Sequence, residues 1–150
     1  MAIMSNSRMI RAFMKKPEKY GDPMTTPRDI ALSYLAAFSS GNPEEVAAHV
    51  TKDFQNNQMG VFGSCFSGRD LYLERLKGYL SSFRNLHYTT EDVIVDGNKV
   101  VIAYHMTAEN NQQPLNIKGV MIITTTDGLV SIRSDYWDGL TYLKQTGIGL

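Results

Sequence analysis

In the first half of the chain, apolar residues recur every three to five positions, which is the spacing of one face of an α-helix. The first such stretch begins at Thr26-Pro27, where the threonine can accept backbone N–H groups and the proline suits the first turn. It ends at Gly41. A second, short helix is predicted from Asn42-Pro43, and a third over residues 69–83.

From residue 92 onward the apolar period shortens to two, which is typical of strands with one buried face. Asp96-Gly97 and Asp127-Gly128 are signals for two-residue turns. Residues 92–108 and 114–138 are therefore each predicted to form a β-hairpin, and together they predict an antiparallel meander of at least four strands.

Two segments are less regular. Residues 52–60 are polar without a clear period, and residues 140–150 allow one helical turn before Gly147. The predicted class is α+β, with three helices packed on one face of a strongly curved antiparallel sheet. A sheet that bends beneath a helix layer encloses a pocket on its concave face, lined mainly by apolar side chains.

Composition removes several classes of function. The chain has 150 residues, of which 43% are hydrophobic and 20% charged, so it can bury a core as one domain. Fifteen basic and fifteen acidic residues cancel, which argues against nucleic acid as a partner.

No apolar run approaches the ~20 residues that span a membrane. The single cysteine, Cys65, excludes an internal disulfide and fits a reducing compartment, so a cytoplasmic location is expected.

Residues 1–25 differ from the rest of the chain. They are basic and rich in methionine, and they lack the apolar segment of ~7–15 residues that a secretory signal needs. We expect an extension that is weakly ordered or dependent on a partner, with an organellar targeting signal as the alternative. The folded domain is then residues 26–150.

The first candidate for chemistry is Asp135, which lies inside the last predicted strand and near the only tryptophan, Trp137. An apolar pocket disfavours a charged carboxylate, which suits a group that accepts or releases a proton near neutral pH. The alternative is an ion pair with Arg133 or a backbone hydrogen bond. Strict alternation places both residues opposite Val130 and Ile132, so a β-bulge is required for Asp135 to face the helices.

Tyr104 is the second candidate. It shares one strand face with Ile102 and Met106, and its hydroxyl can either donate to a substrate oxygen or serve as the polar end of a core aromatic.

The three histidines are scattered without metal-ligand spacing, and no glycine-rich phosphate loop is present. No metal or cofactor is therefore expected.

The order of these elements, with "LNIKGV" at 115–120 and "DGLVSIRSDYWD" at 127–138, resembles the NTF2-like superfamily, and most closely its SnoaL-like and limonene-epoxide-hydrolase branch. The resemblance covers residues 26–150. It implies the cone-shaped fold of SnoaL-like and ketosteroid-isomerase-like proteins, with a deep pocket. It also implies a homodimer through the convex sheet face, which carries Val101, Val120 and Ile122.

The resemblance assigns Asp135 to the position of the strand carboxylate that acts as acid or base in limonene-epoxide-hydrolase-like enzymes. Asn56 and Gln58 fall near the residues that hold the attacking water there. Tyr104 and Met106 stand where those enzymes have an arginine and a second aspartate, so that polar triad is incomplete. Together with Asn56 and Gln58, the residues predicted to contact the ligand are Leu35, Phe38, Phe83, Tyr88, Ile102, Met106, Leu115, Ile117, Trp137 and Tyr142.

Three functions fit these residues. The first is a small cofactor-independent enzyme in which Asp135 and Tyr104 perform acid–base chemistry on an apolar polyketide-, terpenoid- or steroid-like molecule. Isomerisation, cyclisation, dehydration and hydration are all open to it. The second is an epoxide hydrolase, which requires another carboxylate near Asp135. The third is a non-catalytic binding or association module, in which Asp135 is paired with Arg133 or exposed to solvent.

Overall fold

A computed structural model describes residues 25–149 of the chain. The extension predicted over residues 1–25 lies, apart from Thr25, outside the described residues. The elements, in chain order, are α2 (Pro27–Ala37), the 3-10 turn η1 (Phe38–Ser40), α3 (Pro43–Ala47), β1 (Val50–Gln58), β2 (Cys65–Ser67), α4 (Arg69–Ser82), β3 (Arg84–Asp96), β4 (Lys99–Asn110), β5 (Gln113–Thr126), β6 (Leu129–Trp137) and α5 (Gly139–Thr146).

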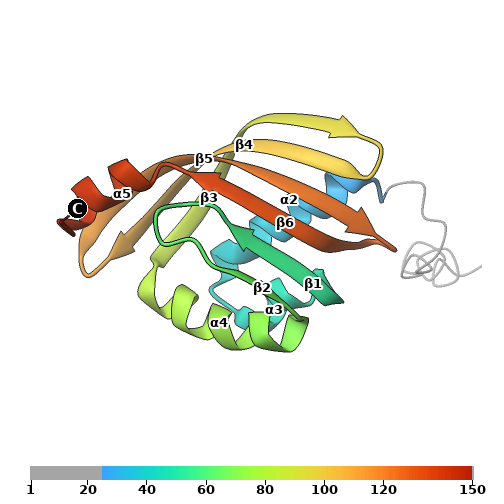
Figure 1. Cartoon of the computed structure of the whole chain (residues 1–150), viewed down its shortest axis with the longest axis horizontal. Coiled ribbons are helices and arrows are strands. Elements are labelled where there is room, and N and C mark those ends of the chain that lie inside the picture. The colour runs from blue at the N-terminus through green and yellow to red at the C-terminus, as the bar shows by residue number, and fades with distance from the viewer. Residues whose placement is uncertain (1–24, 150) are drawn as a thin grey trace, which may run out of the picture.

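The strands form one curved, open sheet in the order β2-β1-β6-β5-β4-β3. Helices α2, α3 and α4 cover its concave side, and α5 lies at one end beside β5 (Figure 1). The α+β class and the meander β3 to β6 are confirmed. The sheet is not wholly antiparallel, however, because β1 pairs in parallel with β6. The described residues contain four helices rather than three, because the turn expected before Gly147 extends into α5.

The first helix begins as its sequence signal predicts. The Thr26 side chain accepts a hydrogen bond from the Asp29 backbone N–H at 3.2 Å, and the Asp29 carboxylate accepts one from the Thr26 N–H at 3.1 Å. This reciprocal capping box fixes where α2 starts. The helix buries Tyr34 and Leu35, and Phe38 in the following turn, against the concave sheet face. Gly41 ends it in the left-handed conformation, with φ at 68°.

Strand β1 is the element that the sequence pattern did not reveal. Its inward-facing side chains are Val50, Phe54 and Asn56, which are buried, and Gln58, which is half-buried. The valine and the phenylalanine are apolar, whereas the asparagine and the glutamine border cavities rather than the packed core. The usual alternation of apolar and polar residues is therefore lost in this strand. Its last residue lies beside Asp135 in the parallel pairing of β1 with β6.

A bulge in β6 decides which way Asp135 faces. The pairing with β5 shifts between Thr124 and Thr125, which oppose Ile132 and Val130 and leave Ser131 without a partner. As a result Val130, Arg133 and Asp135 are all buried on the concave face. The bulge that strict alternation required is present, and the carboxylate points toward the helices.

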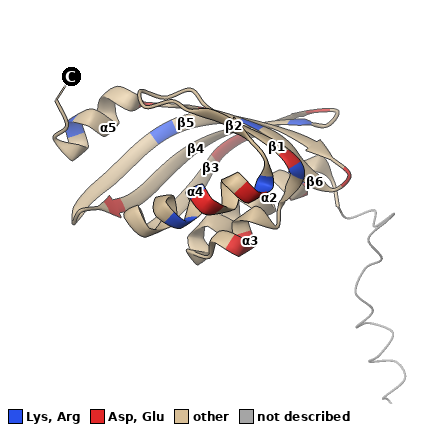
Figure 2. Cartoon of the chain, turned by 60° about the horizontal axis from the view of Figure 1, so that its bottom comes forward, with Lys and Arg blue, Asp and Glu red and all other residues tan. Residues whose placement is uncertain are grey.

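The charged residues do not gather in one region. Lysine and arginine are interspersed with aspartate and glutamate over the helices and strands (Figure 2). Within residues 25–149, no helix is both long enough and apolar enough to cross a membrane.

Candidate active site

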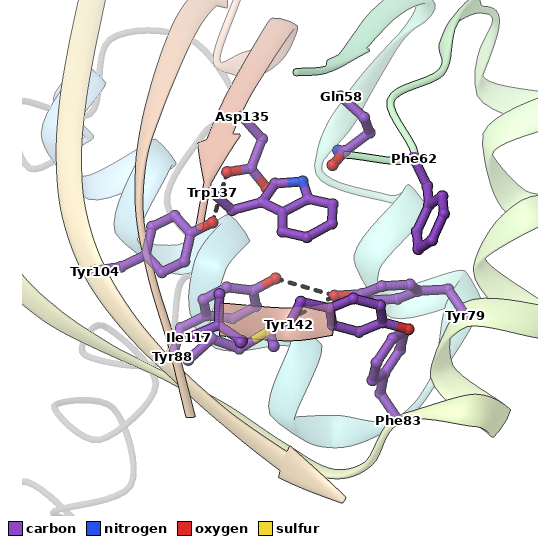
Figure 3. A pocket seen from close by; sticks show the side chains of 11 residues that line it. Gln58, Phe62, Tyr79, Phe83, Tyr88, Tyr104, Ile117, Asp135, Trp137 and Tyr142 are labelled. Atoms are coloured by element: carbon purple, nitrogen blue, oxygen red, sulfur yellow. Dashed lines mark hydrogen bonds between the residues drawn. The ribbon is translucent and has the colours of Figure 1, made fainter. Parts of the chain in front are cut away.

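A cavity of about 220 Å³ opens between the concave sheet face, α4, α5 and the loop after β1. Its wall is mainly aromatic, and its polar groups come from the strands and from α4 and α5 (Figure 3). The lining side chains are Gln58, Phe62, Tyr79, Phe83, Tyr88, Tyr104, Met106, Ile117, Asp135, Trp137 and Tyr142. A concave, mainly apolar site with a few convergent polar groups is typical of small-molecule binding.

Asp135 and Tyr104 meet at the wall of this cavity. The Tyr104 hydroxyl donates to Asp135 Oδ1 at 2.6 Å, although the two residues stand on strands that are separated by β5 (Figure 3). Gly119 of β5 lies between them and pairs with Tyr104. A Cβ atom at this glycine would collide with the Tyr104 hydroxyl and would lie 2.8 Å from the Tyr136 carbonyl oxygen. The absence of a side chain at Gly119 therefore lets the tyrosine reach the carboxylate.

Arg133 holds the other carboxylate oxygen. Its Nη2 donates to Asp135 Oδ2 at 2.8 Å, and the two side chains are 5% and 4% exposed. The guanidinium lies 5.3 Å from the centre of the Phe38 ring. Burial disfavours its charge, but Tyr34 and Asp135 outweigh this effect and raise the pKa of Arg133 above its ordinary range. Arg133 is therefore a cation that requires a counter-charge.

The ion pair changes the expected environment of Asp135. The sequence suggested a carboxylate isolated among apolar groups or, as the alternative, one paired with Arg133. The structure contains the pair, with Asp135 in the wall of this cavity. Arg133 and Tyr104 each donate to one oxygen of the Asp135 carboxylate. The two donors fix its orientation, and the carboxylate can still be reached from the cavity.

Tyrosines supply further hydroxyls at this cavity. Burial, followed by the charge of Asp135, raises the pKa of Tyr104 far above its ordinary value, so this residue keeps its proton and remains a donor. The Tyr79 and Tyr88 hydroxyls lie 3.3 Å apart and face the cavity (Figure 3). Desolvation also raises the pKa of Tyr88 well above its usual range. These hydroxyls are neutral at every physiological pH.

Most of the predicted ligand-contacting residues border a cavity. Gln58, Phe83, Tyr88, Met106, Ile117, Trp137 and Tyr142 line the first, while Phe38, Asn56 and again Gln58 line a second cavity beside it. Leu35, Ile102 and Leu115 line neither cavity, because they are buried in the packed core. Periodicity cannot separate such core positions from cavity walls, since both face inward.

Three residues that contribute to the site were not predicted from the sequence. Tyr79 lies on the inward stripe of α4, so its spacing was a usable signal for a wall residue. Phe62 lies in an irregular loop and gave none. Gly119 gave none either, because its role depends on the approach of Tyr104 across β5. Arg133 was predicted only as the alternative partner of Asp135, and that ion pair is present. Between residues 25 and 149, no group of three or more His, Cys, Asp or Glu side chains is arranged to hold a metal ion.

Several solved structures share this fold. A protein from Catenulispora acidiphila with a ketosteroid isomerase-like fold, in complex with trimethylamine, is 18% identical with a TM-score of 0.74, over 83% of this chain and 96% of that one. A proposed isomerase from Bacillus subtilis is 17% identical with a TM-score of 0.72, over 83% and 94%. A proposed SnoaL-like polyketide cyclase from a Jannaschia species is 16% identical with a TM-score of 0.71, over 87% and 98%.

At these identities the structural matches show the fold alone. No curated protein matches the chain. The sequence profile of the SnoaL-like domain, however, matches residues 31–132, which is more than half of the chain. This protein therefore belongs to the SnoaL-like domain family and has the NTF2-like α+β fold, with a curved, open sheet of six strands.

Proposed function

We propose that this protein is a cofactor-independent isomerase or cyclase in which Asp135 moves a proton on an apolar small molecule. The observation that carries the proposal is the charged carboxylate of Asp135 at the wall of an aromatic cavity, with Tyr104 as its donor. Family membership supports the reaction class, and the structural neighbours include a proposed SnoaL-like polyketide cyclase and a proposed isomerase.

The surroundings of Asp135 restrict the substrate. An aspartate carboxylate is by its nature a weak base, and both oxygens of Asp135 already accept a hydrogen bond. A weak base removes a proton efficiently only from a carbon that is already acidic, because proton transfer needs a small difference in basicity. We therefore expect a substrate whose reacting C–H lies between two carbonyls, or between a carbonyl and an aromatic ring.

Tyr104 has a second role in this mechanism. In the resting protein its hydroxyl is engaged by Asp135. When Asp135 has accepted the proton it is neutral, and the hydroxyl is then released to donate to the enolate oxygen that forms. Protonated Asp135 returns the proton to another carbon and completes an isomerisation. If a carbonyl carbon is held nearby, the enolate carbon attacks it instead, and protonated Asp135 gives its proton to the alkoxide that forms, which completes a cyclisation.

The other two functions differ in their support. An epoxide hydrolase of the limonene-epoxide-hydrolase type needs a second carboxylate, and neither of the two cavities contains another aspartate or glutamate in its wall. A non-catalytic binding module is favoured by one specific observation, the ion pair of Arg133 with Asp135. That pair would fix the cavity wall whether or not a proton is transferred.

Hydrogen–deuterium exchange of a ketone separates catalysis from binding without knowledge of the natural substrate. The probe is 2-tetralone, whose activated CH2 lies between a carbonyl and an aromatic ring. Exchange in D2O is followed by proton NMR with wild type, Asp135→Asn and Tyr104→Phe. The control is Asp127→Asn, at an exposed hairpin position with φ of 51° that asparagine accepts. Fluorescence of Trp137, in the cavity wall, reports binding separately.

The proposal requires protein-dependent exchange that falls by about 10²–10⁴-fold in Asp135→Asn, the usual contribution of a general base. The control variant should keep the wild-type rate. Quenching of Trp137 without any exchange would reject the enzyme and favour the binding module.

A homodimer through the convex sheet face also stays a proposal. It is supported by Val120 and Tyr136, which pair across β5 and β6 and are 40% and 47% exposed. Exposed apolar side chains next to each other are typical of association surfaces. Sedimentation velocity measures the mass directly, and a monomer at all concentrations would contradict the expectation.

A further inference from the structure

A second cavity of about 180 Å³ lies between α4 and the strands β1, β2 and β6. Gln58 and Tyr79 line both cavities, so the two share a wall. Unlike the first cavity, the second contains two arginines, Arg75 and Arg133, and no carboxylate in its wall. The pair of Arg133 with Asp135 spans the boundary, with the cation at the second cavity and the anion at the first.

Arg133 has more donors than it uses. A guanidinium carries five N–H groups. Those of Arg133 reach Asp135 at 2.8 Å and, weakly, the Tyr34 hydroxyl at 3.5 Å. The buried Nε finds no partner among residues 25–149. A buried donor without an acceptor is costly and is rare in native proteins. The side chain is thus nine-tenths buried, incompletely satisfied and part of the second cavity's wall.

Two further groups at this cavity carry unused donors. Asn56 is 4% exposed, and its Oδ1 accepts from the Gln58 amide at 3.3 Å, while its own amino group donates to no described residue. Arg75 stands at the exposed side, held by a hydrogen bond of 2.9 Å to the Ser64 hydroxyl and stacked 4.3 Å from the Phe66 ring centre. Within residues 25–149 it has no acidic partner among the ion pairs, so its charge is uncompensated.

We propose that the second cavity is a carboxylate subsite, and that the ligand is an amphipathic carboxylic acid whose apolar body fills the first cavity. This rests on the proposed function, in which the first cavity holds the ligand. A carboxylate can accept several N–H groups at once and balances the charge of Arg75, which a neutral carbonyl cannot do. Each cavity alone is below the ~300 Å³ at which small-molecule sites begin, whereas the two together exceed it.

The subsite is tested with probes that differ only in charge. Phenylbutyrate, phenylhexanoate and phenyloctanoate are compared with their methyl esters, and acetate serves as a free anion. Trp137 fluorescence reports the first cavity, and the side-chain N–H signals of Arg133 Nε and Asn56 in a ¹⁵N correlation spectrum report the second. The variants are Arg75→Gln and Asn56→Leu. The control is Lys77→Gln, which removes an equal charge from an exposed position of the same helix.

We expect the acid of optimal length to bind about tenfold more tightly than its ester and to shift the Arg133 and Asn56 signals. Arg75→Gln should weaken binding of the acid about three- to tenfold and leave binding of the ester unchanged. The control Lys77→Gln should leave binding of both the acid and the ester unchanged. Asn56→Leu should also weaken the acid selectively.

Three results would overturn the inference in different ways. If acid and ester quench Trp137 equally and the Arg133 signal stays in place, the subsite is refuted while the first cavity remains a ligand site. If acetate alone shifts Arg133 as far as the acids do, and the acids gain nothing over their esters, the cavity takes a free anion only. If no probe changes either signal, the ligand role of the first cavity fails together with the subsite.

Discussion

Replacing Asp135 with asparagine tests whether the buried ion pair supports the fold. The substitution keeps the size of the side chain and removes its charge. Arg133 is 5% exposed and would lose its only anionic partner among the described residues. Its guanidinium cannot lose its proton, because its pKa lies above an already high ordinary value. The variant therefore leaves an uncompensated charge in the core.

The magnitude follows from the geometry. Removing one partner of a buried ion pair costs about 3–5 kcal/mol. The asparagine oxygen can still accept one hydrogen bond from Tyr104 or Arg133, so we expect a loss near the lower end, about 3 kcal/mol. For a chain of 150 residues this corresponds to a decrease of roughly 6–12 °C in Tm. A loss of this size is a large part of the ~5–15 kcal/mol that typical domains possess.

Urea unfolding at neutral pH measures the effect, with Asp127→Asn as an exposed control that should stay within about 0.5 kcal/mol of wild type. A double variant, Arg133→Met with Asp135→Leu, removes both charges and should be more stable than Asp135→Asn, since no charge is left unpaired. An Asp135→Asn protein as stable as wild type would refute this reasoning. It would mean that the carboxylate is a local cost to folding, as an isolated catalytic acid would be.

Two further predictions concern Tyr104 and its neighbour. Burial, and then the charge of Asp135, raises the pKa of Tyr104, so the folded protein keeps a proton that the unfolded chain loses above about pH 10. The free energy of unfolding should fall as pH rises past that value, by about 1.4 kcal/mol per pH unit for each such tyrosine. In urea unfolding measured at several pH values, Tyr104→Phe should make this slope shallower by the contribution of one tyrosine. An unchanged slope would contradict the prediction. Gly119→Ala should lose about 1–3 kcal/mol in the same assay, because its methyl group displaces the Tyr104 hydroxyl. Gly78→Ala, at a helical position with nothing within 4 Å of the added Cβ, is the matched control and should gain up to about 1 kcal/mol; equal effects at both glycines would contradict the clash.

Local signals in the sequence determined most of the elements. The Thr26–Asp29 capping box, Gly41 and the turns at Asp96-Gly97 and Asp127-Gly128 act over a few residues, so their effect can be read without the rest of the molecule. They gave the first helix, the meander and the α+β class. The α4 stripe was equally clear, because its apolar residues repeat at the helical period.

Tertiary structure alone decided the site. The bulge near Ser131 turns Asp135 inward, and Gly119 leaves the space through which Tyr104 reaches it across β5. Strand β1 stayed hidden because its inward positions Asn56 and Gln58 border cavities instead of the packed core. Register, bulges and cavities depend on contacts between residues far apart in the chain, and no local pattern encodes them. The sequence could therefore name Asp135, Tyr104 and the possible ion pair with Arg133, but it could not decide whether the pair forms or which way the carboxylate faces.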